Sequence, residues 1–140
     1  MIERTLAMIK PDGVARGLIG EVIRRIEVEH LKIIDIKMTQ LTQEQAKEFY
    51  AVHKGSVHYE GLTNFTASGP VVVMVLEGLF AVSRWRDMVG ATRWSEAVPG
   101  TIRRDFGHTN IVRQNVVHGS DSPETAEFEI NYFFKESNYV

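Results

Sequence analysis

The stretch from 115 to 122, Asn-Val-Val-His-Gly-Ser-Asp-Ser, gathers an imidazole, an amide, a carboxylate and hydroxyl groups within a few residues. A neutral histidine ring can serve as a nucleophile or a general base near neutral pH. Two valines precede His118 and suit a buried strand end, while Gly119 gives the backbone freedom to turn sharply. Ser122 followed by Pro123 is typical of a helix start. We therefore expect His118 in the bend between a strand and a helix.

His118 taken alone leaves two interpretations open. A histidine after two valines is more often a packed side chain bonded to a backbone carbonyl than a catalyst. Glu129 favours catalysis, because it should lie near the packed face of the following helix, where a carboxylate requires a hydrogen-bond donor such as His118. Such a pair would fix the ring tautomer and raise the nucleophilicity of the other nitrogen. The alternative, a surface glutamate, is equally compatible with the sequence. The apolar neighbours on that helix face are Ala126, Ile130 and Phe133.

Three cationic side chains stand at or near the ends of separate predicted elements and could together bind phosphate. They are Lys10, Arg86 and Arg103. Solvated surface charge is the default interpretation for any one of them. The glycine-rich phosphate loops G-x-x-x-x-G-K-S/T and G-x-G-x-x-G do not occur, so side chains would have to hold a phosphate. Thr92 and Asn115 are polar residues at element ends, and Tyr50 on an apolar helix face favours a core position.

The composition restricts the class of protein. A chain of 140 residues, 44% hydrophobic and 24% charged, suits a single domain over 1–140. The net charge of -2 argues against bulk binding to nucleic acid or to an anionic membrane. The absence of cysteine excludes disulfides and thiolate chemistry, and the longest apolar run, 70–76, is too short to span a bilayer. We expect a cytoplasmic protein with neither a membrane nor nucleic acid as a partner.

Alternating strand and helix patterns position these residues. Strands are predicted at 5–9, 31–41, 70–76 and just before His118, and helices near 19–26, 42–53, 62–67, 80–89 and 122–134. The sequence predicts a turn over 11–13 after Lys10, an end to the third strand at Glu77-Gly78, and an aperiodic, arginine-bearing loop over 91–114.

The order of these elements fits a doubly wound parallel sheet or a split βαβ sheet of ferredoxin-like type. In the second strand Ile34, Ile36 and Met38 alternate with Asp35 and Lys37, which predicts one wet face. That pattern favours an antiparallel sheet covered by helices on one side. Periodicity alone does not decide between the two folds.

Five segments carry a resemblance that runs nearly end to end in unbroken order. They are 4–13, 66–76, 90–92, 99–103 and 115–122. In these segments the chain resembles the nucleoside diphosphate kinases, and Asn-x-x-His-Gly-Ser-Asp-Ser is a highly specific motif. The resemblance implies an α/β fold, more narrowly a ferredoxin-like α+β sandwich with a four-stranded antiparallel sheet covered by helices. It also implies ping-pong transfer of the terminal phosphate from a nucleoside triphosphate to a nucleoside diphosphate.

The resemblance also implies roles for individual residues. His118 would become the phosphohistidine, on the ring nitrogen that faces away from Glu129, and Glu129 with Ser120 would orient the ring. Lys10 would reach the phosphates and the ribose 3′-hydroxyl, and Tyr50 would lie against the phosphorylated imidazole. The resemblance further implies nucleotide contacts from His58, Arg86, Thr92, Arg103, Val112 and Asn115. Mg²⁺ would bridge the nucleotide phosphates, with no metal site made of protein side chains.

The chain departs from the family pattern in three places. His58 replaces the phenylalanine expected to stack on the base, Arg93-Trp94 replaces the usual residues after Thr92, and the segment between Arg103 and Asn115 is slightly longer. We expect a homo-oligomer, as in the family, and the sequence does not choose between dimer, tetramer and hexamer. The departures keep a nucleotide-binding scaffold without turnover as an alternative function, beside a phosphohistidine carrier to protein acceptors.

Overall fold

The computed structural model, which describes residues 1–135, contains one four-stranded antiparallel sheet with the strand order β2-β3-β1-β4. The strands are β1 (Ile2–Ile9), β2 (Lys32–Thr39), β3 (Val71–Leu79) and β4 (Val117–Gly119). The α-helices are α1 (Pro11–Ala15), α2 (Ile19–Val28), α3 (Gln43–Phe49), α4 (Tyr59–Thr66), α5 (Ala81–Val89), α6 (Ile102–Phe106) and α7 (Pro123–Phe134). Short 3₁₀ turns cover Ala51–His53 and Trp94–Glu96.

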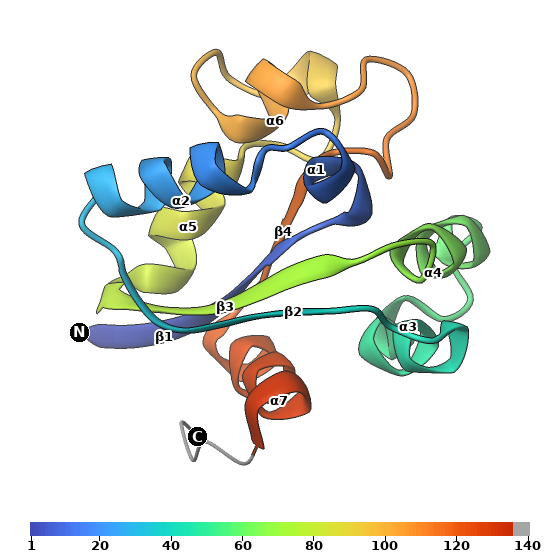
Figure 1. The fold of residues 1–140 in the computed structure, drawn as a ribbon, viewed down its shortest axis with the longest axis horizontal. Coiled ribbons are helices and arrows are strands. Elements are labelled where there is room, and N and C mark those ends of the chain that lie inside the picture. Colours follow the sequence, from blue (N-terminus) through green and yellow to red (C-terminus); the bar gives the residue numbers. More distant parts are fainter. Residues whose placement is uncertain (136–140) are drawn as a thin grey trace.

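The helices cover both faces of the sheet, so the expectation of a single covered face is wrong (Figure 1). One hydrophobic cluster joins alternate residues of β1 and β3 to α2, α5 and α6, and the other joins the intervening residues to α3 and α7. Because side chains alternate across a strand, the two central strands need apolar residues at every position. This explains the continuous apolar run of β3, which is buried from Val71 to Leu76. The fold is the predicted ferredoxin-like α+β sandwich.

Strand β2 lies at one edge of the sheet, and its exposed side chains differ from those the alternation predicts. Ile36 and Met38 are 45% and 57% exposed, although their apolar character suggested an inward face. The pairing of β2 with β3 is irregular between Ile33 and Asp35, where the register shifts. A one-residue shift moves every following side chain to the other face of a strand, which accounts for the difference.

Three local expectations are also corrected. The residues after Lys10 form the short helix α1 rather than a turn, because proline is well tolerated at a first helical position. Strand β3 continues through Glu77 and Gly78 to Leu79, paired with the N-terminal half of β1. The segment 91–114 is not wholly irregular, since it contains α6 and a 3₁₀ turn.

Candidate active site

His118 lies within β4, opposite Met8 of β1, and not in the bend that follows the strand. Its Nε2 is 2.8 Å from Oε1 of Glu129 on α7, and the Ser120 hydroxyl donates to the same oxygen at 2.8 Å. Ser120 in turn accepts the backbone N–H of Leu6. Because a carboxylate only accepts hydrogen bonds, Nε2 carries the ring proton and Nδ1 keeps its lone pair. The expected histidine–carboxylate pair is therefore present, with Nδ1 available for reaction.

Two aromatic rings of the α3 end hold the imidazole edge-on. The ring centroid of His118 is 5.2 Å from that of Phe49 and 5.7 Å from that of Tyr50, and the interplanar angles are 67° and 87°. Tyr50 is buried, as its place on the apolar helix face predicted. Burial and the nearby Glu129 carboxylate raise the pKa of its hydroxyl, so Tyr50 is neutral at physiological pH.

Gly119 is required by close packing and not by the backbone freedom that the sequence suggested. Its φ lies outside the positive range that favours glycine, whereas a Cβ at this position would stand 2.7 Å from Cδ1 of Trp85. The Trp85 indole also donates to the His118 carbonyl at 3.2 Å. The buried tryptophan of α5 thus lies directly against the strand that carries the histidine.

Lys10 is buried at the end of β1, 3% exposed, and its ammonium group points toward the segment before β4. Nζ donates to the Arg113 carbonyl at 2.7 Å and to Oδ1 of Asn115 at 2.9 Å. Burial, followed by repulsion from Arg103, lowers the pKa of Lys10 from 10.5 to about 7. The protonation of this lysine is therefore sensitive to any anion that approaches it.

A strained turn separates Asn115 from the strand. Val116 has a φ of 75°, a rare conformation for a β-branched residue, and the N–H of Val117 donates to the Asn115 carbonyl at 2.9 Å. Oδ2 of Asp12 accepts the Val116 N–H at 3.0 Å, and the Lys10 N–H donates to the Val116 carbonyl at 2.8 Å. Residues that follow β1 therefore hydrogen-bond both the N–H and the carbonyl of Val116, which fixes the segment before His118.

The two predicted arginines reach the same region from different elements. Arg86 on α5 pairs with Asp121 at 2.7 Å, with both side chains about half exposed. Arg103 on α6 donates to the carbonyls of Gly90 and Val117, and its buried Nε has no hydrogen-bond partner among the described residues. Burial lowers the pKa of Arg103 to about 10, which leaves it charged at neutral pH. The guanidinium groups of Arg86 and Arg103 and the buried ammonium of Lys10 therefore lie around the same region beside His118.

These side chains line one cleft, and most predicted residues meet in it. The lining residues are Lys10, Tyr50, His53, Ser56, His58, Tyr59, Leu62, Arg86, Thr92, Arg103, Asn115, His118, Gly119 and Asp121. Glu129 and Ser120 lie behind the imidazole, and Val112, 36% exposed, is not among the lining residues. Sequence reasoning gave neither Asp12 nor Asp121 a role in the site, although both lie in the segments that carry the family resemblance.

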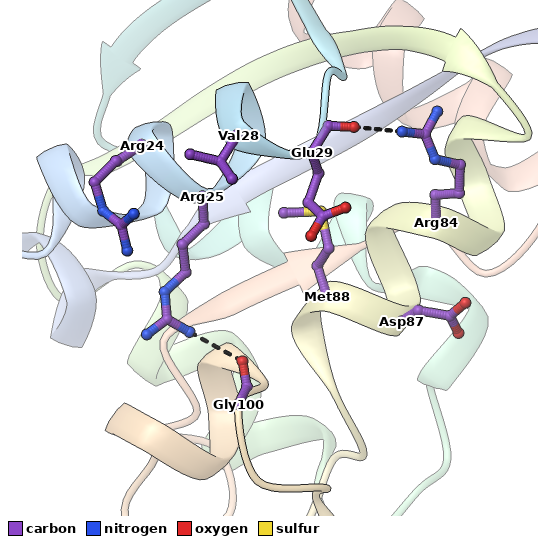
Figure 2. Close-up of a pocket in the computed structure, with 8 residues that line it drawn as sticks. All are labelled: Arg24, Arg25, Val28, Glu29, Arg84, Asp87, Met88 and Gly100. Atoms are coloured by element: carbon purple, nitrogen blue, oxygen red, sulfur yellow. Dashed lines mark hydrogen bonds between the residues drawn. The ribbon is translucent and has the colours of Figure 1, made fainter.

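A second hollow lies between α2, α5 and the loop at Gly100 (Figure 2). The arginines that line this hollow already have hydrogen-bond or ion-pair partners within the protein. Arg84 donates to the Glu29 carbonyl and Arg25 to the Gly100 carbonyl, and the Arg24 guanidinium is paired with Glu21. The hollow therefore differs in chemistry from the cleft around His118, which is lined by the imidazole and the buried Lys10.

Within residues 1–135, no helix is long and apolar enough to cross a membrane, and no group of three or more histidine, aspartate or glutamate side chains is placed to hold a metal ion. The cleft instead combines a carboxylate-oriented histidine with converging cations on a ferredoxin-like sandwich. This combination suits a phosphotransferase that works through histidine.

Comparison with known proteins identifies the family. A family model described as nucleoside diphosphate kinase matches residues 3–139. The nucleoside diphosphate kinase of Desulfosudis oleivorans is 62% identical over 133 residues, which cover 95% of this chain and 94% of that protein. The crystal structure of the Aquifex aeolicus nucleoside diphosphate kinase superposes with a TM-score of 0.94 at 40% identity, covering both chains completely. A Halobacterium salinarum nucleoside diphosphate kinase in complex with CDP gives 0.92 at 43% identity, covering 100% of this chain and 92% of that one.

The chain belongs to the nucleoside diphosphate kinase family. It is a phosphotransferase that moves the terminal phosphate of a nucleoside triphosphate to a nucleoside diphosphate through a phosphohistidine, as members of the family do.

Proposed function

We propose that His118 is the residue phosphorylated in this reaction, at Nδ1. The observation that carries the proposal is the 2.8 Å bond between Nε2 and Glu129, which leaves the Nδ1 lone pair directed away from the carboxylate. In the first half-reaction Nδ1 bonds to the γ-phosphorus while the bond from that phosphorus to the β-phosphate oxygen breaks, and the diphosphate leaves. In the second half-reaction a β-phosphate oxygen of another diphosphate attacks the same phosphorus, and the bond to Nδ1 breaks.

Glu129 stabilises the positive charge that the imidazole develops as the new bond forms, and Ser120 holds the carboxylate in place with its 2.8 Å hydrogen bond. Tyr50 and Phe49 confine the ring edge-on, which restricts its rotation. Phosphoryl transfer depends mainly on positioning and charge neutralisation, so a rigid imidazole is the main requirement of the nucleophile.

The cations hold the phosphates. Arg86, Arg103 and Lys10 would bind the phosphate oxygens, with Thr92 assisting through its hydroxyl. Asn115 would contact the sugar, and Lys10, whose Nζ donates to Oδ1 of Asn115, would reach the 3′-hydroxyl of that sugar. His58, exposed at the mouth of the cleft, would stack on the base in place of a phenyl ring.

Mg²⁺ would be held chiefly by the phosphates of the nucleotide, whose charge it neutralises when bound. The charged side chains that line the cleft fit this arrangement. Among the described residues that line the cleft, Asp121 is the only carboxylate, and it is engaged by Arg86 at 2.7 Å. The remaining charged lining residues are Lys10 and Arg103, which suit phosphate oxygens and would repel a cation.

The proposal is tested by incubating the protein with γ-labelled ATP and Mg²⁺ and isolating the labelled protein. We expect an acid-labile, alkali-stable phosphoprotein that loses its label to added nucleoside diphosphate, and no label on His118→Ala. The exposed His30→Ala is the matched control and should label normally. Label on the His118→Ala protein would contradict the assignment, while label that passes only to a protein acceptor would favour the carrier function.

We also propose that residues 1–140 form one domain, that the protein is a homo-oligomer and that it is cytoplasmic. The exposed edge strand β2, with Ile36 and Met38 uncovered, and the 52% exposed Phe128 of α7 support assembly. Light scattering at micromolar concentration should give a multiple of the subunit mass, and Met38→Lys should lower it. A monomeric mass for the unaltered protein would contradict this proposal.

A further inference from the structure

Asp12 is a buried carboxylate to which the transfer mechanism assigns no role. It lies in α1, two residues after Lys10, and is 8% exposed. Oδ2 accepts the Val116 N–H, whereas Oδ1 is buried with no hydrogen-bond partner among the described residues. A buried carboxylate oxygen without a donor is costly, so its retention requires a compensating interaction.

The first such interaction holds a strained stretch of backbone in place. A φ of 75° at Val116 is strained and persists only where the surroundings hold it. Asp12 and the backbone of Lys10 bind the two polar groups of Val116, and a Cβ on Gly13 would stand 3.1 Å from the Val116 carbonyl oxygen. Val116 is followed by the strand of His118, so these contacts fix the nucleophile relative to the lysine.

The second interaction is electrostatic. Burial, Arg103 and Arg113 all lower the pKa of Lys10, and Asp12 is the group that raises it. Burial lowers the pKa of Arg103, whereas Tyr50, Asp121 and, after them, Asp12 raise it. The remaining contacts of Nζ are neutral, namely the Asn115 amide oxygen, the Arg113 carbonyl and the Phe65 ring. One carboxylate therefore acts on both buried cations of the cleft.

We propose that Asp12 is a positioning residue for phosphoryl transfer, whose Oδ2 holds the turn before His118 and whose unpartnered Oδ1 supplies the buried negative charge that opposes Lys10 and Arg103. This inference rests on the proposed function, because the groups it positions are the nucleophile and the phosphate-binding cations. Asp12 therefore has two separable effects, one on the geometry of the turn before His118 and one on the charge beside the two buried cations.

The charge effect is tested with Asp12→Asn, which keeps an oxygen acceptor for Val116. ADP binding is measured by calorimetry between pH 5.5 and 8.5 for both proteins. We expect the ratio of the variant Kd to the unaltered Kd to approach one at the acid end and to rise to a plateau above pH 7, by about tenfold for each unit by which the Lys10 pKa falls. Titration of ADP itself occurs with both proteins and cancels in the ratio.

The geometric effect is tested with Asp12→Ala, which removes both the acceptor and the charge. At saturating ATP we expect His118 to be phosphorylated at least tenfold more slowly than in Asp12→Asn, because a small displacement of a nucleophile has a large effect on rate. Equal rates in the two variants would overturn the geometric part of the proposal.

Asp87→Asn is the matched control, because Asp87 is exposed and lies beside the second hollow (Figure 2). It should leave ADP binding unchanged at every pH. A Kd ratio for Asp12→Asn that is independent of pH would overturn the charge effect, including the case in which binding is uniformly weaker. Phosphorylation of His118 in the unaltered protein keeps such a failure distinct from failure of the proposed function.

Discussion

Replacing Lys10 by methionine should stabilise the folded protein while abolishing its activity. Methionine keeps an unbranched chain of similar length without the ammonium group, and the site is 3% exposed. In the folded state the pKa of Lys10 is lowered from 10.5 to about 7, mainly by burial. At about 1.4 kcal/mol per pKa unit, the burial of the charged form costs about 5 kcal/mol relative to the unfolded chain.

The sign of the pH dependence follows from proton binding. Below pH 7 the lysine is protonated in both states, so the unaltered protein bears the full cost. Between pH 7 and 10.5 the unfolded state binds the extra proton, so the stability contribution of Lys10 rises with pH. The stability advantage of Lys10→Met should therefore be greatest below pH 7 and should shrink by about 2 kcal/mol between pH 7 and pH 9.

Guanidinium unfolding followed by tryptophan fluorescence, to which the buried Trp85 contributes, measures this difference. Both proteins are compared at one protein concentration, because assembly would otherwise change the apparent stability. The substitution also removes the hydrogen bonds of Nζ, which changes the stability of the variant by a constant amount and leaves the pH dependence intact. Two stability curves that stay parallel from pH 6 to pH 9 would refute a lowered Lys10 pKa.

Three further results are expected. Nucleotide binding at pH 8 should take up close to one proton, because phosphate raises the lysine pKa again, and a binding heat that is the same in buffers of different ionisation enthalpy would contradict this uptake. Glu129→Gln should slow phosphorylation of His118 about tenfold, since a charge-assisted hydrogen bond becomes a neutral one, and an unchanged rate in a quenched-flow assay would remove Glu129 from the mechanism. Gly119→Ala should lower the free energy of unfolding by about 1–3 kcal/mol through its clash with Trp85. Gly20→Ala in α2 should raise that free energy, because a Cβ there meets nothing within 4 Å, and equal effects of the two substitutions in thermal unfolding would disprove the role of packing at Gly119.

The sequence predicted the order of the elements because their patterns are local. The helix start at Ser122 and the capping box at Thr42 both occur as expected, and the apolar face of α7 correctly placed Glu129 near the core. These features depend on residues three or four positions apart, which a single sequence displays directly.

What the sequence could not predict depends on contacts between distant segments. The positive φ of Val116 is set by Asp12, 104 residues earlier, and glycine at 119 is explained only by Trp85 on another element. The exposed apolar face of β2 follows from a register shift against β3. No local sequence pattern predicts contacts between such distant residues, so most of the residue roles came from the family resemblance.

The discharge of the phosphorylated protein tests the central assignment most directly. Phosphoprotein freed of nucleotide would be mixed with ADP, GDP, CDP or UDP in a rapid-quench apparatus, and the label on protein and nucleotide measured over time. We predict that label leaves His118 and appears as the matching nucleoside triphosphate in every case, within a single turnover. A phosphoprotein that keeps its label in the presence of all four diphosphates would contradict the assignment.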